Sequence, residues 1–251
     1  MEVRFPFKKQ LQQTASILFW IFLWHVAAVS VNKNLLIPIP LPLETAVVFF
    51  KNCKNADFWS AVGVSILHIT LGFLSGAVLG SLSGFFSGSS KFFRYLSSPL
   101  LHLIRSVPVA AFIILAWLWI PTNLLPSFIS CLMVLPIVHI AVENGLFAVD
   151  PKLTEMARVM GLSATRTFFH IKLPAICPFL RSGCINGLGF AWKSGVAAEV
   201  ICNPTRSIGA LLSSSKSNID YGQVFAVTLT IVFLSLLLEN VIKFIWKEPK
   251  L

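Results

Sequence analysis

Five ionisable side chains interrupt long apolar runs, and their types and spacing limit the chemistry that they can perform. They are Arg105, His139, Glu143, Lys193 and Glu199. Charged groups at membrane depth usually face a water-filled path or a partner. No nucleophile beside a base and no Cys/His group with metal-ligand spacing accompanies them, and the five cysteines are scattered singly. These residues therefore suit the recognition of charge better than a catalytic or metal-binding role.

Lys193 lies well inside its apolar run. Asn186, Gly189, Lys193 and Ala197 share one helical stripe, because seven residues make nearly two turns. Glycines beside a cation leave room for an anion, so we expect Asn186 and Lys193 to line a substrate pathway that favours a negatively charged solute. An internal ion pair or a lysine that reaches the interface explains Lys193 equally well.

The other four ionisable groups have simpler explanations. Glu199 lies about 240° around the helix from Lys193, too far to pair with it. Near the external end of its run, Glu199 suits an external gate of the pathway, a docking contact or an interfacial position. His139 and Glu143 are four residues apart, and a pair within the bundle is favoured over a proton relay. Arg105 is expected to snorkel to the interface.

The composition indicates a membrane protein. The chain has 251 residues, of which 56% are hydrophobic and only 12% are charged, about half the charged fraction of a soluble domain. The net charge of +10 comes from short basic clusters between apolar runs. Nucleic acid would require those charges on one solvated face and is excluded as a partner. Lipid must therefore be part of the solvent.

Six stretches are long enough to cross a hydrocarbon core of about 30 Å. They are Thr14–Val31, Ser60–Phe86, Pro99–Ile120, Ser127–Ala148, Ala175–Cys202 and Gln223–Ile245. With the N-terminus inside, thirteen Lys and Arg residues fall in cytoplasmic segments and five in external ones. The sequence predicts an all-α, polytopic integral membrane protein with about six transmembrane helices, one domain over residues 1–251, and both termini in the cytoplasm.

Two further patterns concern helix placement. Prolines at 38, 40 and 42 precede the apolar run Leu43–Phe50, which we expect to lie along the external membrane surface. Glycines recur every four residues in the second predicted span, where small residues let two helices approach closely. They are Gly72, Gly76, Gly80, Gly84 and Gly88, the last of which is expected in the following loop.

The segment 150–174 is too polar for the bilayer and is patterned as helices. Asp150 is suited to cap a helix that starts at Pro151. The apolar stripe of this helix is Leu153, Met156, Ala157 and Met160. Gly161 is placed to end it in a left-handed conformation.

A second short helix is expected after that glycine. Ser163 can cap it, Ala164, Phe168 and Ile171 lie on one side, and Pro174 suits the first turn of the next span. We expect a rigid two-helix projection. It can fit a groove on another protein, or its stripe can pack on the chain's own helices.

The spacing in this loop resembles that of a known family. Glu155-x-Ala157-x3-Gly161-x9-Ile171-x-Leu173-Pro174 is similar to the signature EAA–x3–G–x9–I–x–LP of binding-protein-dependent ABC importer permeases, with Met156 at the second alanine. Arg105-x-x-Pro108 and Gly187–Phe190, followed by Ala191-Trp192-x4-Ala197-Ala198-Glu199, are similar to the nitrate/sulfonate/taurine branch. The resemblance covers most of the chain.

The resemblance implies a permease subunit of a bacterial inner membrane and not an enzyme. Its coupling helices, which dock on a cytoplasmic ATPase, would include six signature residues. They are Glu155, Ala157, Gly161, Ile171, Leu173 and Pro174. The implied partners are a second copy in a homodimer, two ATPase subunits that bind ATP and Mg, and an external solute-binding protein.

The implied cargo is a small anion such as a sulfonate, taurine or nitrate, or a vitamin precursor, moved by alternating access. No GxxxxGK[ST] motif occurs, so no cofactor is expected on this chain and ATP hydrolysis belongs to another chain. The alternative is an ion-driven secondary transporter, which would need an acidic site at mid-membrane and usually an internal repeat.

Overall fold

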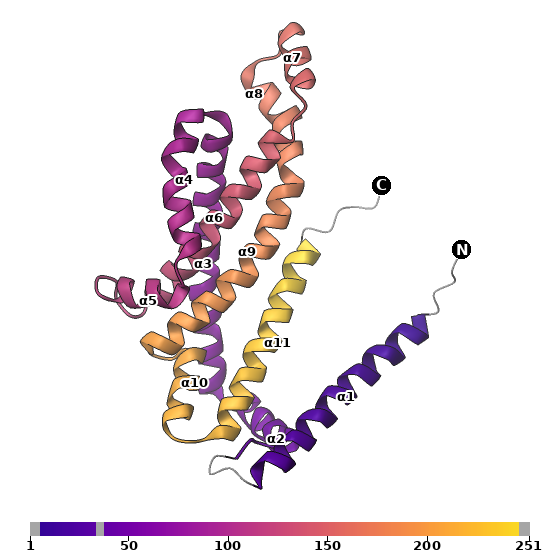
Figure 1. The fold of residues 1–251 in the computed structure, drawn as a ribbon, viewed down its shortest axis with the longest axis vertical. Helices are drawn as coiled ribbons and strands as arrows, with labels where there is room; N and C mark the ends of the chain where they lie inside the picture. Colours follow the sequence, from indigo (N-terminus) through magenta and orange to yellow (C-terminus); the bar gives the residue numbers. More distant parts are fainter. Residues whose placement is uncertain (1–5, 34–37, 246–251) are drawn as a thin grey trace.

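The structure is a computed structural model that describes residues 6–33 and 38–245, and every regular element in these ranges is a helix. The prediction of an all-α membrane protein is therefore confirmed. In Figure 1 the loop with α7 and α8 forms one end of the molecule, and α2 and α10 lie at the other. The helices are α1 (Pro6–Asn32), α2 (Pro42–Cys53), α3 (Ala56–Ser89), α4 (Lys91–Ser106), α5 (Val109–Trp117), α6 (Leu125–Phe147), α7 (Pro151–Val159), α8 (Ala164–Thr167), the π-helix η1 (Phe168–Lys172), α9 (Leu173–Cys202), α10 (Ile208–Ser217) and α11 (Tyr221–Ile245).

Four helices are long and apolar enough to cross a membrane. They are Thr14–Asn32, Ala56–Ser89, Leu125–Phe147 and Tyr221–Phe244, which correspond to the first, second, fourth and sixth predicted spans. The fifth predicted span forms α9, a continuous helix of 30 residues despite its glycines. It carries Arg181, Lys193 and Glu199 and does not reach the apolar composition of the other four.

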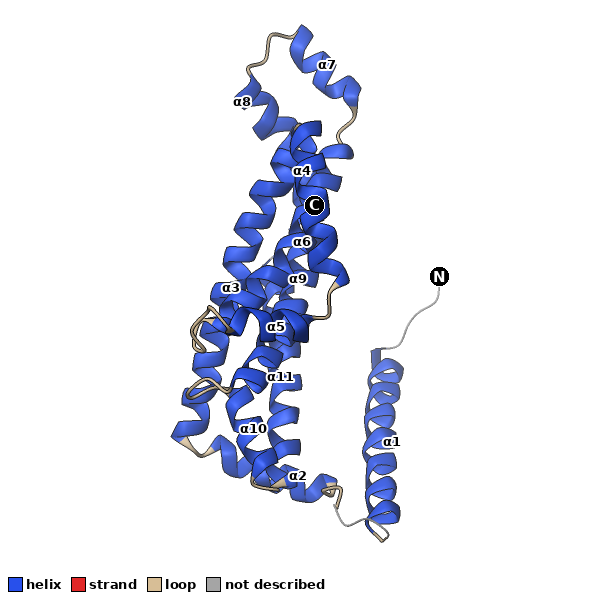
Figure 2. Ribbon diagram, turned by 60° about the vertical axis from the view of Figure 1, so that its left-hand side comes forward, coloured by secondary structure: helices blue, strands red, loops and turns tan. Residues whose placement is uncertain are grey.

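The third predicted span, Pro99–Ile120, is not one straight helix, and it counts as a single crossing only if the bent pair α4 and α5 is one broken span. The helix instead starts at Lys91, and α4 and α5 meet at an angle of 102°. Val107 is extended, with φ −86° and ψ 134°, because the ring of Pro108 disfavours a helical conformation in the residue before it. The break turns α5 across the bundle, as Figure 2 shows.

Helices α3 and α6 pack through the glycine stripe. A Cβ at Gly76 would lie 2.7 Å from the Cys131 carbonyl oxygen, and one at Gly80 would lie equally close to that of Leu135. The predicted packing face is therefore confirmed, with α6 as its partner. Gly88 belongs to this face and to α3, against Leu146, so its expected position in a loop is wrong.

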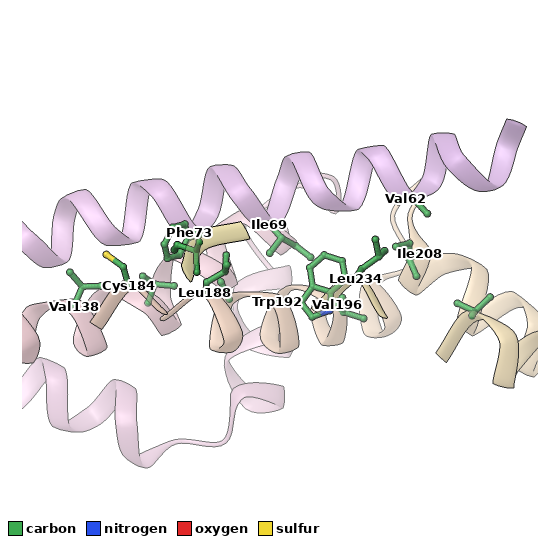
Figure 3. Close-up of a cluster of buried hydrophobic side chains, with 14 of the residues drawn as sticks. Val62, Ile69, Phe73, Val138, Cys184, Leu188, Trp192, Val196, Ile208 and Leu234 are labelled. Atoms are coloured by element: carbon green, nitrogen blue, oxygen red, sulfur yellow. The ribbon is translucent and has the colours of Figure 1, made fainter. Parts of the chain in front are cut away.

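The hydrophobic core is centred on α9, between α3, α6 and α11. Trp192 is 2% exposed, and its indole Nε1 donates to the Ile231 carbonyl oxygen at 3.1 Å. The same cluster contains Ile69 of α3, Val138 of α6 and Leu234 of α11. Figure 3 shows how these side chains fill the space beside α3. The core fixes α9 at the centre of the molecule. The polar residues on the opposite face of α9 are thereby held in fixed positions.

Helix α1 stands apart from this core, as Figure 2 shows. Its apolar side chains are mostly exposed, as expected of a helix that faces lipid, and Trp24 stacks on Phe225 of α11 with ring centroids 5.7 Å apart. Helix α2 forms over the predicted run after the prolines and lies at the end of the molecule opposite α7. Asn52 exchanges two amide hydrogen bonds with Gln223, which ties α2 to α11.

Candidate coupling loop and solute pathway

The first half of the polar loop has the predicted local structure. The Asp150 carboxylate accepts a hydrogen bond from the Lys152 N–H at 2.9 Å, and Pro151 is the first residue of α7. Gly161 has φ +68°, a conformation that other residues adopt only with strain. The Leu162 N–H donates back to the Ala157 carbonyl at 2.9 Å. These bonds close α7 and turn the chain sharply toward α8.

The second half differs from the expected separate helix. Ser163 caps α8 by accepting from the Arg166 N–H at 3.4 Å, but α8 is only four residues long and continues through η1 into α9. In η1 the Leu173 N–H donates five residues back to Phe168, and Pro174, which has no N–H, follows directly. The projection is therefore one free helix, α7, and an extension of α9.

The apolar stripe of α7 is largely uncovered by this chain. Leu153, Met156 and Met160 are 45%, 54% and 70% exposed, whereas Ala157 is buried against the loop. Packing of the whole stripe on the chain's own helices, one of the two interpretations, is therefore wrong. Phe168 meets Phe85 of α3 edge to face, with ring centroids 5.4 Å apart. The loop presents apolar side chains outward while it is anchored to α3 and α9.

A cavity of about 670 Å³ lies between α4, α5, α6 and α9. It brings Asn186 and Lys193, both predicted pathway residues, together with Arg105. Lys193 Nζ lies 6.0 Å from the centroid of the Phe190 ring, within reach of a cation–π contact. Within the described part of the chain, neither Lys193 nor Arg105 has an ion-pair partner. The lining thus carries two cations and, among described residues, no carboxylate.

Arg105 also lines this cavity, a position that the sequence did not predict. It lies there because α4 ends one residue later and the chain turns into α5. The sequence did contain a signal for this position. Arg105 lies three residues before Pro108, and a helix usually ends just before a proline. The expected reach of Arg105 to the membrane interface stays a prediction.

Glu199 is not part of the cavity. Its side chain is fully buried within the protein, and its Oε2 accepts from Ser65 Oγ at 2.7 Å and from the Gly209 N–H at 3.1 Å. Ser65 also accepts from the Ile208 N–H at 2.9 Å. Glu199 therefore joins the end of α9 to α3 and to the start of α10.

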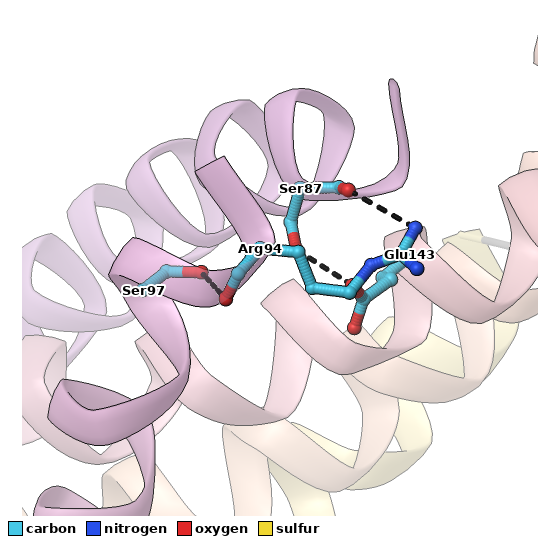
Figure 4. A network of polar contacts seen from close by, with 4 residues as sticks. All are labelled: Ser87, Arg94, Ser97 and Glu143. Carbon is cyan, nitrogen blue, oxygen red and sulfur yellow. Dashed lines mark hydrogen bonds and ion pairs between the residues drawn. The ribbon is translucent and has the colours of Figure 1, made fainter. Parts of the chain in front are cut away.

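His139 and Glu143 share a face of α6, but each makes its hydrogen bond to α3. His139 Nδ1 lies 2.9 Å from Ser83 Oγ, and Ser87 Oγ donates to Glu143 Oε1 at 2.6 Å. Glu143 also forms an ion pair with Arg94 at 3.1 Å, as Figure 4 shows. The expected pairing of His139 with Glu143 is therefore replaced by bonds across the helix interface.

Helices long and apolar enough to span a membrane surround a cation-lined cavity, an arrangement that fits a membrane transport protein. Residues 76–247 match the family described as "Binding-protein-dependent transport system inner membrane component". The match covers more than half of the chain, and the protein belongs to this family. It is therefore a multi-pass inner-membrane permease of an ABC importer and a non-catalytic transport subunit, whose family works with a separate ATPase and a binding protein.

Individual relatives agree with this family. The chain is 25% identical over 248 residues to the nitrate import permease protein NrtB of Synechocystis sp., covering 94% of this chain and 88% of that protein. It is 29% identical over 190 residues to the putative aliphatic sulfonates transport permease protein SsuC of Bacillus subtilis, covering 75% and 68%. A solved structure of an amino acid ABC transporter has the same fold, with a TM-score of 0.65 at 14% identity, covering 82% of this chain and 98% of that one.

Proposed function

We propose that this permease carries a small anionic solute through the cavity between α4, α5, α6 and α9, with Lys193 and Asn186 as pathway residues. The observation that carries the proposal is the pair of cations, Lys193 and Arg105, that face one cavity without a carboxylate among its described lining. Unpaired cations at membrane depth are unfavourable unless an anion or water accompanies them. A sulfonate, taurine, nitrate or an acidic vitamin precursor fits this chemistry, and the named functions of NrtB and SsuC support the first and third.

The segment 150–174 is, in this proposal, the coupling loop that docks on the ATPase. Its exposed stripe provides an apolar surface of Leu153, Met156 and Met160 for a groove on the partner. Movement of the loop would reach the pathway directly, because α8 and η1 continue into α9, which also carries Asn186 and Lys193. Alternating access would then follow from a shift between two conformations when the ATPase binds ATP.

The assembly proposed is a homodimer of this chain with two ATPase subunits and an external binding protein. The residues that line the cavity come from α4 to α6 and α9 and, within the described part of the chain, none comes from α1, α3 or α11, so a second copy can complete the pathway. Both described ends, the start of α1 and the end of α11, point toward the side of the molecule that carries α7, as Figure 1 shows. With α7 on the ATPase, both termini would be cytoplasmic, in agreement with the bias of basic residues.

The proposal is tested by Lys193→Gln in the complete transporter, reconstituted with its ATPase and binding protein. Uptake of labelled nitrate, taurine and methanesulfonate is measured first, to find which anion the transporter accepts. For that anion we expect the variant to lose roughly tenfold or more of its uptake rate, because a hydrogen bond to a charged group contributes about 1.5–3 kcal/mol.

Lys216→Gln is the matched control, since Lys216 is exposed on α10 at the end opposite the coupling loop. Lys193→Arg should keep a large part of the uptake if charge is what matters. Unchanged uptake in Lys193→Gln would remove Lys193 from the pathway.

A further inference from the structure

A second, smaller cavity continues the first one toward the coupling loop. It has a volume of about 270 Å³ and lies between α4 and α6, with Ser87 of α3 also in its lining. The α6 residues of the larger cavity are Met133, Pro136 and Ile137, whereas those of the smaller one are His139, Ile140 and Glu143, on the next turns of the helix. We call the larger one the outer cavity and the smaller one the inner cavity. The two cavities therefore follow one another along the same groove.

Arg105 is common to the two cavities. It is among the residues that line the outer cavity with Lys193, and it also lines the inner cavity with His102 of α4. A guanidinium carries five N–H donors in a rigid plane and binds oxyanions with two parallel bonds. Because Arg105 lines both cavities, its guanidinium can contact an anion in either of them.

The charges of the inner cavity favour an anion. Its one carboxylate, Glu143, is already engaged by Arg94 at 3.1 Å and by Ser87 at 2.6 Å. The guanidinium of Arg94 also lies over the Phe147 ring, 4.3 Å from its centroid. Arg105 faces the same space with no ion-pair partner in the described part of the chain. Two guanidiniums against one carboxylate leave an excess positive charge, and Ser98 adds a hydroxyl donor, whereas the Ser97 hydroxyl already donates to the Arg94 carbonyl oxygen at 3.3 Å.

We propose that the inner cavity is a second anion site, at which a small oxyanion such as a sulfonate rests between the outer cavity and the cytoplasm. Arg105 passes the anion from one cavity to the other, and Glu143 keeps Arg94 from holding it too tightly. The direction of passage rests on the function proposed above. The anion preference of the inner cavity does not, and it can be tested separately.

The test measures charge preference with thiol reagents in the assembled transporter, purified with its ATPase in detergent. Ser98→Cys reports on the inner cavity and Met133→Cys on the outer one, since each residue lines only its own cavity. Each is treated with methanethiosulfonate reagents that carry either a sulfonate or a trimethylammonium group. Mass spectrometry of the peptide that contains the new cysteine gives the rate at that position, and Ser214→Cys on the exposed face of α10 sets the reference ratio.

We expect the sulfonate reagent to be favoured at position 98 by about tenfold over the reference ratio, the effect of one nearby charge in a wet site. Arg105→Gln should lower the preference at both positions. Lys193→Gln should lower it at position 133 only, and Glu143→Gln should raise it at position 98 only. Because Glu143→Gln predicts a change of opposite sign, the proposal stays testable even if Arg105→Gln fails to assemble.

The outcomes separate the two proposals. If the cysteine at position 98 reacted with the two reagents in the reference ratio while position 133 kept a preference for the sulfonate reagent, the second site would be overturned. The Lys193 pathway would remain supported. A preference at position 98 alone would support the inner site and contradict the outer pathway. A preference at position 98 that Arg105→Gln and Glu143→Gln both leave unchanged would overturn the assignment of the site to these residues.

Discussion

The glycine stripe of α3 allows a quantitative test of how the bundle is held together. An ideal Cβ at Gly76 would lie 2.7 Å from the Cys131 carbonyl oxygen and 2.9 Å from Val134 Cβ. The first contact falls roughly 0.7 Å short of the 3.4 Å at which ordinary packing begins, so Gly76→Ala must push α3 and α6 apart. Gly63, on the same helix, has nothing within 4 Å of such a Cβ.

The two glycines should therefore respond to alanine with opposite signs. Overpacking costs about 1–3 kcal/mol, whereas alanine is favoured over glycine inside a helix by about 0.5–1 kcal/mol. We expect Gly76→Ala to lower the free energy of unfolding by up to about 2.5 kcal/mol after this gain is subtracted, and Gly63→Ala to leave it equal or slightly higher. Unfolding in mixed detergent and SDS micelles, followed by circular dichroism, measures both. Equal effects of the two variants would refute the close packing of α3 on α6.

Two further variants test the buried junction and the loop. Ser65→Ala removes the hydroxyl that joins Glu199 to the Ile208 N–H, so we expect a loss of about 1–3 kcal/mol in the same unfolding assay, with exposed Ser214→Ala unaffected. Equal stability of the two serine variants would contradict that junction. Gly161→Val places a branched residue at φ +68° in a loop where its Cβ meets nothing, so folding should survive while co-purification of the ATPase and uptake are lost. Gly63→Val is its control, and normal uptake in Gly161→Val would reject the coupling role.

Local signals in the sequence predicted local structure well. Asp150, Pro151, Gly161 and Ser163 act on atoms within a few residues of themselves, so their residue types were sufficient to place the start and end of α7 and the start of α8. The glycine stripe was equally readable, because the spacing of four residues defines a helix face. Its partner helix, α6, was not readable, because any apolar helix can meet a glycine face.

Features that depend on contacts between distant segments of the chain could be seen only in the structure. Averaged over about twenty residues, the apolar run around Pro108 looks like one span, and the average hides the 102° bend that puts Arg105 into the cavities. His139 and Glu143 were expected to pair because they are neighbours on one helix, but Ser83 and Ser87 of α3 lie closer once the helices pack. A cavity is formed by several helices together, and no single stretch of sequence contains it.

The central claim is that the exposed stripe of α7 is the surface through which the ATPase drives this permease. A photo-crosslinking residue at position 156, where Met156 is 54% exposed, tests it in the assembled transporter, with position 47 on α2 at the opposite end as the control. We predict a crosslink from position 156 to the ATPase subunit, altered in yield when ATP is bound, and no crosslink to the ATPase from position 47. A crosslink from position 47 to the ATPase, or none from position 156 in a transporter that still takes up its solute, would contradict the claim.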